Sequence, residues 1–272
     1  IVVIFGGIGS TPLLTHDEGR RLVVLREMLT SENWLIPTMN GQVYLAKPPL
    51  FYWIGSIPAM LFNSTAEWVM RLPSGLCAFA AIWLLYIRLR KPIGHWSALF
   101  AVLILVTSYF FIQMARLAEL EMLFAFCTFG AVLFYYEYLD KGGGRYLYAA
   151  YGLLGLAFIT KGPVTLLFFL PPIILYGLLS RSKQALLGLI EWRGWLLFSI
   201  IALPWFIYID SHFQGIPLLN ILERQISHKV VQEGKDPIYF YLRHLAGAVA
   251  PWFLVFFWRP KTLAKQLYAS VP

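Results

Sequence analysis

The stretch from Trp68 to Ile87, WVMRLPSGLCAFAAIWLLYI, decides which class of fold the chain adopts. Arg71 is its only charged residue, and its length matches the roughly 20 apolar residues that a helix needs to cross a bilayer. Two arginines and a lysine follow within residues 88–91. Because short cytoplasmic loops collect lysine and arginine, this stretch predicts a transmembrane helix that ends on the cytoplasmic side.

Apolar runs of similar length recur along the rest of the chain. We expect further spans at about residues 96–113, 121–139, 146–160, 163–179, 194–209 and 239–258. Residues 1–10 are apolar but too few to cross a bilayer, so we expect them to end a longer first span that is truncated here. The sequence therefore predicts an all-α fold, a polytopic transmembrane helix bundle that forms one module over residues 1–272.

The composition excludes a soluble fold. Residues of the AVILMFWYC set make up 59% of the chain and charged residues only 13%, whereas soluble domains carry about 25% charged residues. The net charge of +8 does not indicate nucleic-acid binding, because no soluble segment combines a dense basic stripe with exposed aromatic side chains. Membrane topology explains the excess of basic residues better.

The topology depends on the segment Pro48 to Phe62, which is short and contains three prolines. We interpret it as a re-entrant or interfacial helix and not as a span. The basic loops at residues 88–91, 141–145, 181–193 and 259–265 then all lie in the cytoplasm. The outer side receives a long loop at residues 11–67, a corner at residues 116–121, Lys161, and a loop at residues 210–238.

The long outer loop begins with a helix signal. Thr15 and Glu18 match a capping box, and leucines follow on one face at positions 22, 25 and 29, so we expect a helix along the membrane surface from Asp17 to about Ser31. The two acids in its first turn have an ordinary interpretation, because acids favour the positive end of the helix dipole. They are also candidate catalytic residues, with Asp17 as a general base that takes a proton from an attacking hydroxyl and Glu18 beside it. Both roles can coexist.

Three cations lie at the predicted outer rim: Lys47, Arg116 and Lys161. Lysines at a membrane boundary usually anchor a span by snorkelling, and Arg116 could simply pair with Glu119 at helical spacing. The alternative is that the three cations hold the phosphate of a lipid carrier. Glu121 has no closer partner in the sequence and is a candidate catalytic carboxylate.

The same outer loops supply candidate residues for the donor and substrate pocket, which are Tyr44, Tyr52, Trp53, Glu223 and Arg224. No pair of histidines has the spacing of a zinc motif. The sequence therefore supports no metal site and no required cofactor, although a divalent metal held by residues distant in the sequence stays open.

Several motifs occur in an order that resembles membrane glycosyltransferases of the GT-C type, in the branch of the protein O-mannosyltransferases and the lipid A aminoarabinose transferases. The most specific part is YLAKPPLFYW at residues 44–53 followed by RLPS at residues 71–74. The others are Asp17-Glu18, Asn40-Gly41, Arg116 with Glu121-Met122, TKGP at residues 160–163, and Pro251-Trp252. The resemblance covers residues 17–252.

The resemblance implies an inverting transfer of a monosaccharide from an undecaprenyl or dolichyl phosphate carrier. It implies that Asp17 is the base, that Lys47 contacts the carrier phosphate, and that Arg116 and Lys161 help in the same anionic pocket. Glu121 stands where the family more often has aspartate.

Two departures limit what the resemblance implies. Ala46 stands where relatives commonly carry Asp or Glu, which removes a possible metal ligand. The chain ends at Pro272, whereas relatives continue through further spans.

From these features we expect an integral protein of a bacterial inner membrane with a periplasmic active site. Its partners would be a polyprenyl-phosphate sugar, membrane lipids, and a lipid, glycan or protein acceptor, and not nucleic acid. Two alternatives stay open, a transporter or flippase of lipid-linked sugars and a catalytically incomplete fragment. Transporters usually keep ionisable residues near the bilayer midplane, whereas the charges here cluster at one rim.

Overall fold

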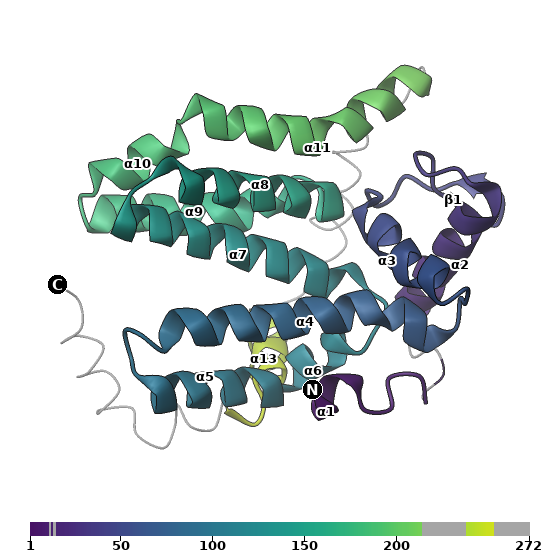
Figure 1. Cartoon of the computed structure of the whole chain (residues 1–272), viewed down its shortest axis with the longest axis horizontal. Helices are drawn as coiled ribbons and strands as arrows, with labels where there is room; N and C mark the ends of the chain where they lie inside the picture. The colour runs from purple at the N-terminus through teal and green to yellow at the C-terminus, as the bar shows by residue number, and fades with distance from the viewer. Residues whose placement is uncertain (11, 13–14, 214–237, 253–272) are drawn as a thin grey trace.

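The computed structural model of the chain describes residues 1–10, 12, 15–213 and 238–252. Within these ranges the chain is helical apart from one two-stranded hairpin, which confirms the predicted all-α class. Figure 1 shows long helices lying side by side and a smaller group of elements at one end of them. That smaller group consists of α2 (His16–Ser31), β1 (Thr38–Met39), β2 (Gln42–Val43) and α3 (Leu50–Leu61).

The body of the bundle is built from α4 (Glu67–Leu89), α7 (Leu120–Lys141), α8 (Gly144–Lys161), α9 (Val164–Leu179) and α11 (Trp192–His212). Helix α8 packs against both α7 and α11, and α7 packs against α4. Gly155 allows the close approach of α8 and α11, because a Cβ there would lie 3.0 Å from the Cβ of Ile201.

Three of these helices, α4, α7 and α11, are long and apolar enough to cross a membrane. They lie at the spans expected at residues 68–87, 121–139 and 194–209. Helices α8 and α9 lie at the spans expected at residues 146–160 and 163–179, and α9 is apolar but shorter. The other described helices are α1 (Val2–Phe5), α10 (Lys183–Leu189) and α13 (Ile238–Ala248). The span expected at residues 239–258 overlaps α13, and its end lies outside the described residues.

The span expected at residues 96–113 is broken and not continuous. Helices α5 (His95–Thr107) and α6 (Tyr109–Ala115) meet at a bend of 69°, with Ser108 between them in an extended conformation. The hydroxyls of Thr107 and Ser108 donate to the carbonyls of Leu103 and Ile104, at 2.6 and 2.7 Å. Hydroxyl groups that bond to the preceding turn in this way often bend a helix.

Basic loops gather at the C-terminal end of α7. Glu137 forms ion pairs there with Arg88, at the end of α4, and with Lys141. Tyr135 Oη donates to Ala185 O at 2.6 Å, which attaches α10 to the same end of the bundle. Arg88, Lys141 and Ala185, from three of the basic loops or next to them, therefore lie at the same end of the bundle.

The segment between α2 and α3 is held in place by a tight hairpin and by two indoles. Asn40 and Gly41 both have positive φ, 55° and 74°, the geometry of a two-residue turn between β1 and β2. The Glu27 carboxylate of α2 accepts from the backbone N–H groups of both turn residues and from the hydroxyl of Thr38. Trp53 Nε1 donates to Trp34 O and Trp205 Nε1 to Leu35 O, at 2.7 and 2.8 Å, so the loop after α2 is fastened to α3 and α11.

Candidate functional site

The N-terminal end of α2 is attached to the start of α7. Thr15 Oγ1 accepts from Glu18 N at 2.9 Å, which confirms the predicted N-cap. The same hydroxyl donates to Glu119 Oε1 at 2.8 Å. One threonine thus joins the first turn of α2 to the residue that precedes α7.

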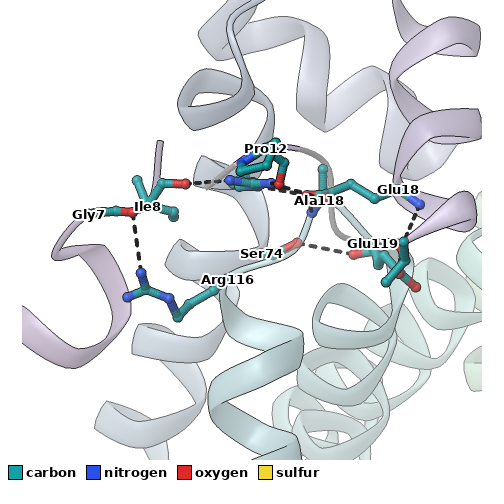
Figure 2. Close-up of polar contacts among 10 residues, drawn as sticks. Gly7, Ile8, Pro12, Glu18, Ser74, Arg116, Ala118 and Glu119 are labelled. Carbon is teal, nitrogen blue, oxygen red and sulfur yellow. Dashed lines mark hydrogen bonds and ion pairs between the residues drawn. The ribbon is translucent and has the colours of Figure 1, made fainter. Parts of the chain in front are cut away.

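Glu18 does not complete the predicted capping box, because its side chain enters a buried ion pair. Arg71 Nε donates to Glu18 Oε1 at 2.7 Å and Arg71 Nη2 to Oε2 at 3.0 Å. Ala118 N also donates to Oε1, at 2.9 Å, and Figure 2 shows Glu18 close to Ala118. The Glu18 and Arg71 side chains are 0% and 1% exposed. A carboxylate enclosed in this way orders the site and is shielded from a substrate, so we assign Glu18 no direct step.

Asp17, the adjacent acid, has the opposite environment. Its side chain is 46% exposed and forms an ion pair with Arg20 one turn later. An accessible carboxylate at the start of a helix can reach a hydroxyl and take its proton. The two acids that the sequence predicts as a pair are therefore separated into one accessible group and one structural group.

Glu121 and Lys161 come together although 40 residues separate them in the sequence. Lys161 Nζ lies 2.9 Å from Glu121 Oε1, and it lies 5.0 Å from the centre of the Phe124 ring. The ion pair joins the start of α7 to the end of α8. Lys161 is thus more than a snorkelling anchor, since its charge is held beside a carboxylate and over an aromatic face.

Glu119 adds a second carboxyl group beside Glu121. It is 8% exposed, and its backbone oxygen accepts from Ser74 Oγ at 3.1 Å. Burial raises the pKa of Glu119 above its ordinary value, and its hydrogen bond with Thr15 opposes that rise. The neighbouring Glu121 carboxyl raises the pKa of Glu119 further, because two close carboxylates repel.

Arg21 connects α2 to the segment that carries Lys47. Arg21 Nη1 donates to Tyr44 Oη at 3.0 Å and to Tyr52 Oη at 3.3 Å. Tyr44 precedes Lys47 by three residues, and Tyr52 lies in the first turn of α3. Burial raises the pKa of Tyr52 to about 12, so its hydroxyl stays protonated at neutral pH.

Lys47 is half-buried, and the two prolines that follow it are buried. Their fixed φ angles limit the backbone conformations available after the lysine. Because Arg21 holds Tyr44, the segment that carries Lys47 lies against the second turn of α2. Asp17 lies in the first turn of the same helix. Trp53 contributes its hydrogen bond to Trp34 and so holds α3 in place.

Arg116 lies apart from this cluster. Its Nη1 donates to Val3 O and Gly6 O, at 2.9 and 2.8 Å, and its Nη2 donates to Gly7 O at 3.3 Å. Figure 2 shows Arg116 pointing toward Gly7, away from Glu119, so the alternative of an Arg116–Glu119 pair is wrong. We therefore leave Arg116 out of the proposed phosphate contacts.

Two predicted pocket residues, Glu223 and Arg224, lie outside the described residues. In the described part of the chain, no group of three or more His, Cys, Asp or Glu side chains is arranged to hold a metal ion. Ala46 is exposed and offers no ligand atom beside Lys47. The described residues thus do not fit a metal centre, and we derive no step through one.

Sequence reasoning did not assign Arg21 or Arg71 to the site, and it did not predict the hydrogen bond from Thr15 to Glu119. Arg71 carried a signal, because a charge inside an apolar span needs a buried partner. Arg21 carried none beyond its place next to Arg20, since only the fold brings Tyr44 and Tyr52 to it.

Known proteins of similar sequence include both uncharacterised and named relatives. A curated protein of Aquifex aeolicus without an assigned function is 32% identical over 84% of this chain. The undecaprenyl phosphate-alpha-4-amino-4-deoxy-L-arabinose arabinosyl transferase of Shewanella sediminis is 24% identical over 91% of it. These two matches cover 52% and 46% of the relatives, so the chain spans about half the length of the curated relatives it matches.

A solved structure shows the same fold. The crystal structure of ArnT from Cupriavidus metallidurans bound to undecaprenyl phosphate superposes with a TM-score of 0.84 at 24% identity, over 94% of this chain and 48% of that one. This likeness confirms a helical membrane fold of the GT-C type. The family described as dolichyl-phosphate-mannose-protein mannosyltransferase, PMT_2, matches residues 46–208, which is more than half of the chain. The chain therefore belongs to the PMT_2 family of membrane glycosyltransferases.

Proposed function

We propose that this chain carries the transfer site of a glycosyltransferase that moves a monosaccharide from a polyprenyl phosphate carrier to a lipid, glycan or protein acceptor. The observation that carries the proposal is a convergence of elements at one end of the bundle. The Thr15–Glu119 hydrogen bond, the Arg21–Tyr44 hydrogen bond and the Glu121–Lys161 ion pair bring the start of α2, the Lys47 segment, the start of α7 and the end of α8 together. These contacts support a site at this end of the bundle to which Asp17, Lys47 and Lys161 would contribute.

Asp17 is the proposed base. An aspartate is ordinarily ionised at neutral pH, and this one is accessible. Asp17 takes the proton of the acceptor hydroxyl while the hydroxyl oxygen attacks the anomeric carbon. The bond from that carbon to the carrier phosphate breaks, and the configuration at the carbon inverts.

Lys47 and Lys161 are the proposed phosphate contacts. The leaving phosphate gains negative charge as the bond breaks, and nearby ammonium groups stabilise that charge. Glu121 holds Lys161 in position by its ion pair, so we assign Glu121 a positioning role in place of the catalytic one expected from the sequence. Of the candidate pocket tyrosines, Tyr44 lies three residues before Lys47 and stays partly exposed, whereas Tyr52 is buried.

The proposed site faces away from the cytoplasm, on the periplasmic side of a bacterial inner membrane. Glu121 is the second residue of α7, and Glu137, with its basic partners, lies 16 residues further along the same helix. At 1.5 Å per residue these groups are about 24 Å apart, close to the thickness of a bilayer core. If the basic loops lie in the cytoplasm, the cluster around Asp17 lies at the outer rim.

The relatives indicate which carrier to test first. The Shewanella protein is named for an undecaprenyl phosphate donor, and the Cupriavidus structure was determined with undecaprenyl phosphate bound. We propose undecaprenyl phosphate as the carrier of this protein as well.

The test is turnover by the purified intact protein, reconstituted with an undecaprenyl-phosphate-linked sugar and a membrane extract as the source of acceptor. We expect release of free undecaprenyl phosphate from the wild type and at least a hundredfold slower release from Asp17→Asn, in line with the usual contribution of a general base. Glu32→Gln, which changes an exposed acid at the other end of α2, is the matched control. Movement of intact donor across the membrane without release of the carrier would instead indicate a flippase and would refute the proposal.

A further inference from the structure

Arg21 differs from the other cations near the site. Three basic residues there are each paired with an acid, in the pairs Asp17–Arg20, Glu18–Arg71 and Glu121–Lys161. Arg21 is only 4% exposed, yet no carboxylate in the described part of the chain lies within 4.0 Å of it. A guanidinium that is buried without an anion is unusual, because native proteins pair such charges.

The donors of Arg21 are only partly used. Its Nη1 contacts the two tyrosine hydroxyls, whereas its Nε is buried and has no hydrogen-bond partner. A guanidinium presents five N–H donors in one plane, and that arrangement matches the two oxygens of a carboxylate or phosphate. The group is thus equipped to bind an oxyanion in addition to the hydroxyls.

Tyr44 and Tyr52 offer two more donors at the same place. Both hydroxyls accept from Arg21, so each keeps its own O–H to donate. No group in the described residues accepts either hydrogen. Tyr52 is 0% exposed and Tyr44 is half-buried, so the cluster is enclosed on the α3 side and open beside Tyr44.

The neighbouring acids do not form an ion pair with Arg21. Glu121 is paired with Lys161. Arg21 acts electrostatically on both Glu119 and Glu121, but neither carboxylate lies within 4.0 Å of its guanidinium. A ligand that brings its own negative charge would therefore complete the balance at Arg21.

We propose that Arg21, Tyr44 and Tyr52 form an oxyanion subsite that binds a carboxylate or phosphate group of the sugar or of the acceptor, separate from the phosphate of the lipid carrier. The subsite makes Arg21 a specificity-determining residue, since it favours substrates with an acidic substituent. The proposal rests on the proposed function in one respect only, namely whether the sugar or the acceptor brings the oxyanion. The carrier phosphate is not a candidate, because Lys47 and Lys161 are assigned to it.

The first test measures binding without turnover. The purified intact protein is titrated with inorganic phosphate, with glucuronate and with undecaprenyl phosphate, and binding is followed by thermal shift and calorimetry. We expect Arg21→Gln to weaken binding of phosphate or glucuronate roughly tenfold or more, and Tyr52→Phe to weaken it roughly two- to tenfold. Affinity for undecaprenyl phosphate should change less than about threefold.

The control is Arg26→Gln, which removes an arginine from the same helix whose Nη2 donates to Thr65 O. It should leave the binding of all three probes unchanged. If Arg21→Gln does not fold, the double variant Tyr44→Phe, Tyr52→Phe keeps the guanidinium and carries the test. The proposal would be overturned if a folded variant bound phosphate and glucuronate as tightly as the wild type does. It would also be overturned if the variant lost as much affinity for undecaprenyl phosphate as for these two probes, because that result would assign Arg21 to the carrier.

A second test identifies the source of the oxyanion. Transfer is measured once with an acidic sugar donor and a neutral acceptor, and once with a neutral donor and a phosphorylated acceptor. If Arg21→Gln slows transfer in only one of these two measurements, the acidic molecule in that measurement is the one that the subsite recognises. Equal transfer rates for wild type and variant in both measurements would overturn the proposal. If the wild type transfers no sugar at all, the proposed function fails, and the binding of phosphate and glucuronate still decides the role of Arg21.

Discussion

Neutralising Glu18 should destabilise the protein strongly, although it changes only one oxygen of a side chain to an amide nitrogen. Glu18→Gln leaves the Arg71 guanidinium, 1% exposed, without the carboxylate that accepts from its Nε and Nη2. The variant also weakens the acceptor of Ala118 N. Removal of one partner of a buried ion pair typically lowers the free energy of unfolding by about 3–5 kcal/mol.

This magnitude corresponds to a fall in Tm of roughly 6–20 °C, at about 2–4 °C per kcal/mol for a chain of this size. The assay is thermal unfolding of the purified protein in detergent, followed by a thiol-reactive dye or by intrinsic fluorescence. Asp17→Asn is the neighbouring control. Its ion pair with Arg20 is about half-exposed, so its loss should cost less than about 1 kcal/mol.

A double variant separates charge from packing. Replacing both partners, as Glu18→Met with Arg71→Met, should recover part of the stability lost in Glu18→Gln, because no buried charge is left unpaired. The reasoning would be refuted if Glu18→Gln kept the wild-type Tm but lost turnover. That result would mean that Glu18 acts on the substrate and not on the fold.

Three other predictions concern the site, the hairpin and the bundle. Lys161→Gln should weaken binding of undecaprenyl phosphate by roughly tenfold or more, measured by calorimetry, because it removes the proposed charge-assisted contact with the phosphate. Lys183→Gln, in α10 at the opposite end of the bundle, should leave this binding unchanged. The hydrogen bond from Thr38 and those from the hairpin turn hold the pKa of Glu27 below its usual value of 4.5, so its stabilisation is present above pH 4.5 and is lost as the pH falls below it. Wild type should therefore lose more Tm between about pH 5 and pH 3 than Glu27→Gln does, and parallel curves would contradict this. Gly155→Ala should destabilise the protein by about 1–3 kcal/mol, because its Cβ would crowd Ile201. The control is Gly152→Ala, whose Cβ would have its nearest contacts at 3.9 Å. It should be neutral or slightly stabilising in the same thermal assay.

Local signals predicted much of this fold. The apolar runs gave the positions of α4, α7 and α11, and the Thr15 cap gave the start of α2, because both depend on residues close together in the chain. The bend at Ser108 was not predicted. Thr107 and Ser108 are compatible with a straight apolar helix, and only the observed backbone shows that they bond to the preceding turn.

The partners of the charged residues were harder to predict. Glu18 fits a capping box by its spacing from Thr15, yet it binds Arg71, which is 53 residues away in the sequence. Arg116 fits a phosphate contact by its motif, yet it binds carbonyls near the N-terminus, such as Gly6 O. In both cases the partner comes from a distant segment of the chain, so the local sequence could not identify it.

We propose that Asp17 and Lys47 line one site that faces away from the cytoplasm. Single cysteines at Asp17 and at Lys47, in a background with Cys77→Ala and Cys127→Ala, can be tested in oriented membrane vesicles with a thiol reagent that does not cross the bilayer. We predict that both positions react only from the outer side, and that undecaprenyl phosphate protects both. Reaction of the two positions from opposite sides, or protection of neither by the lipid, would contradict the account.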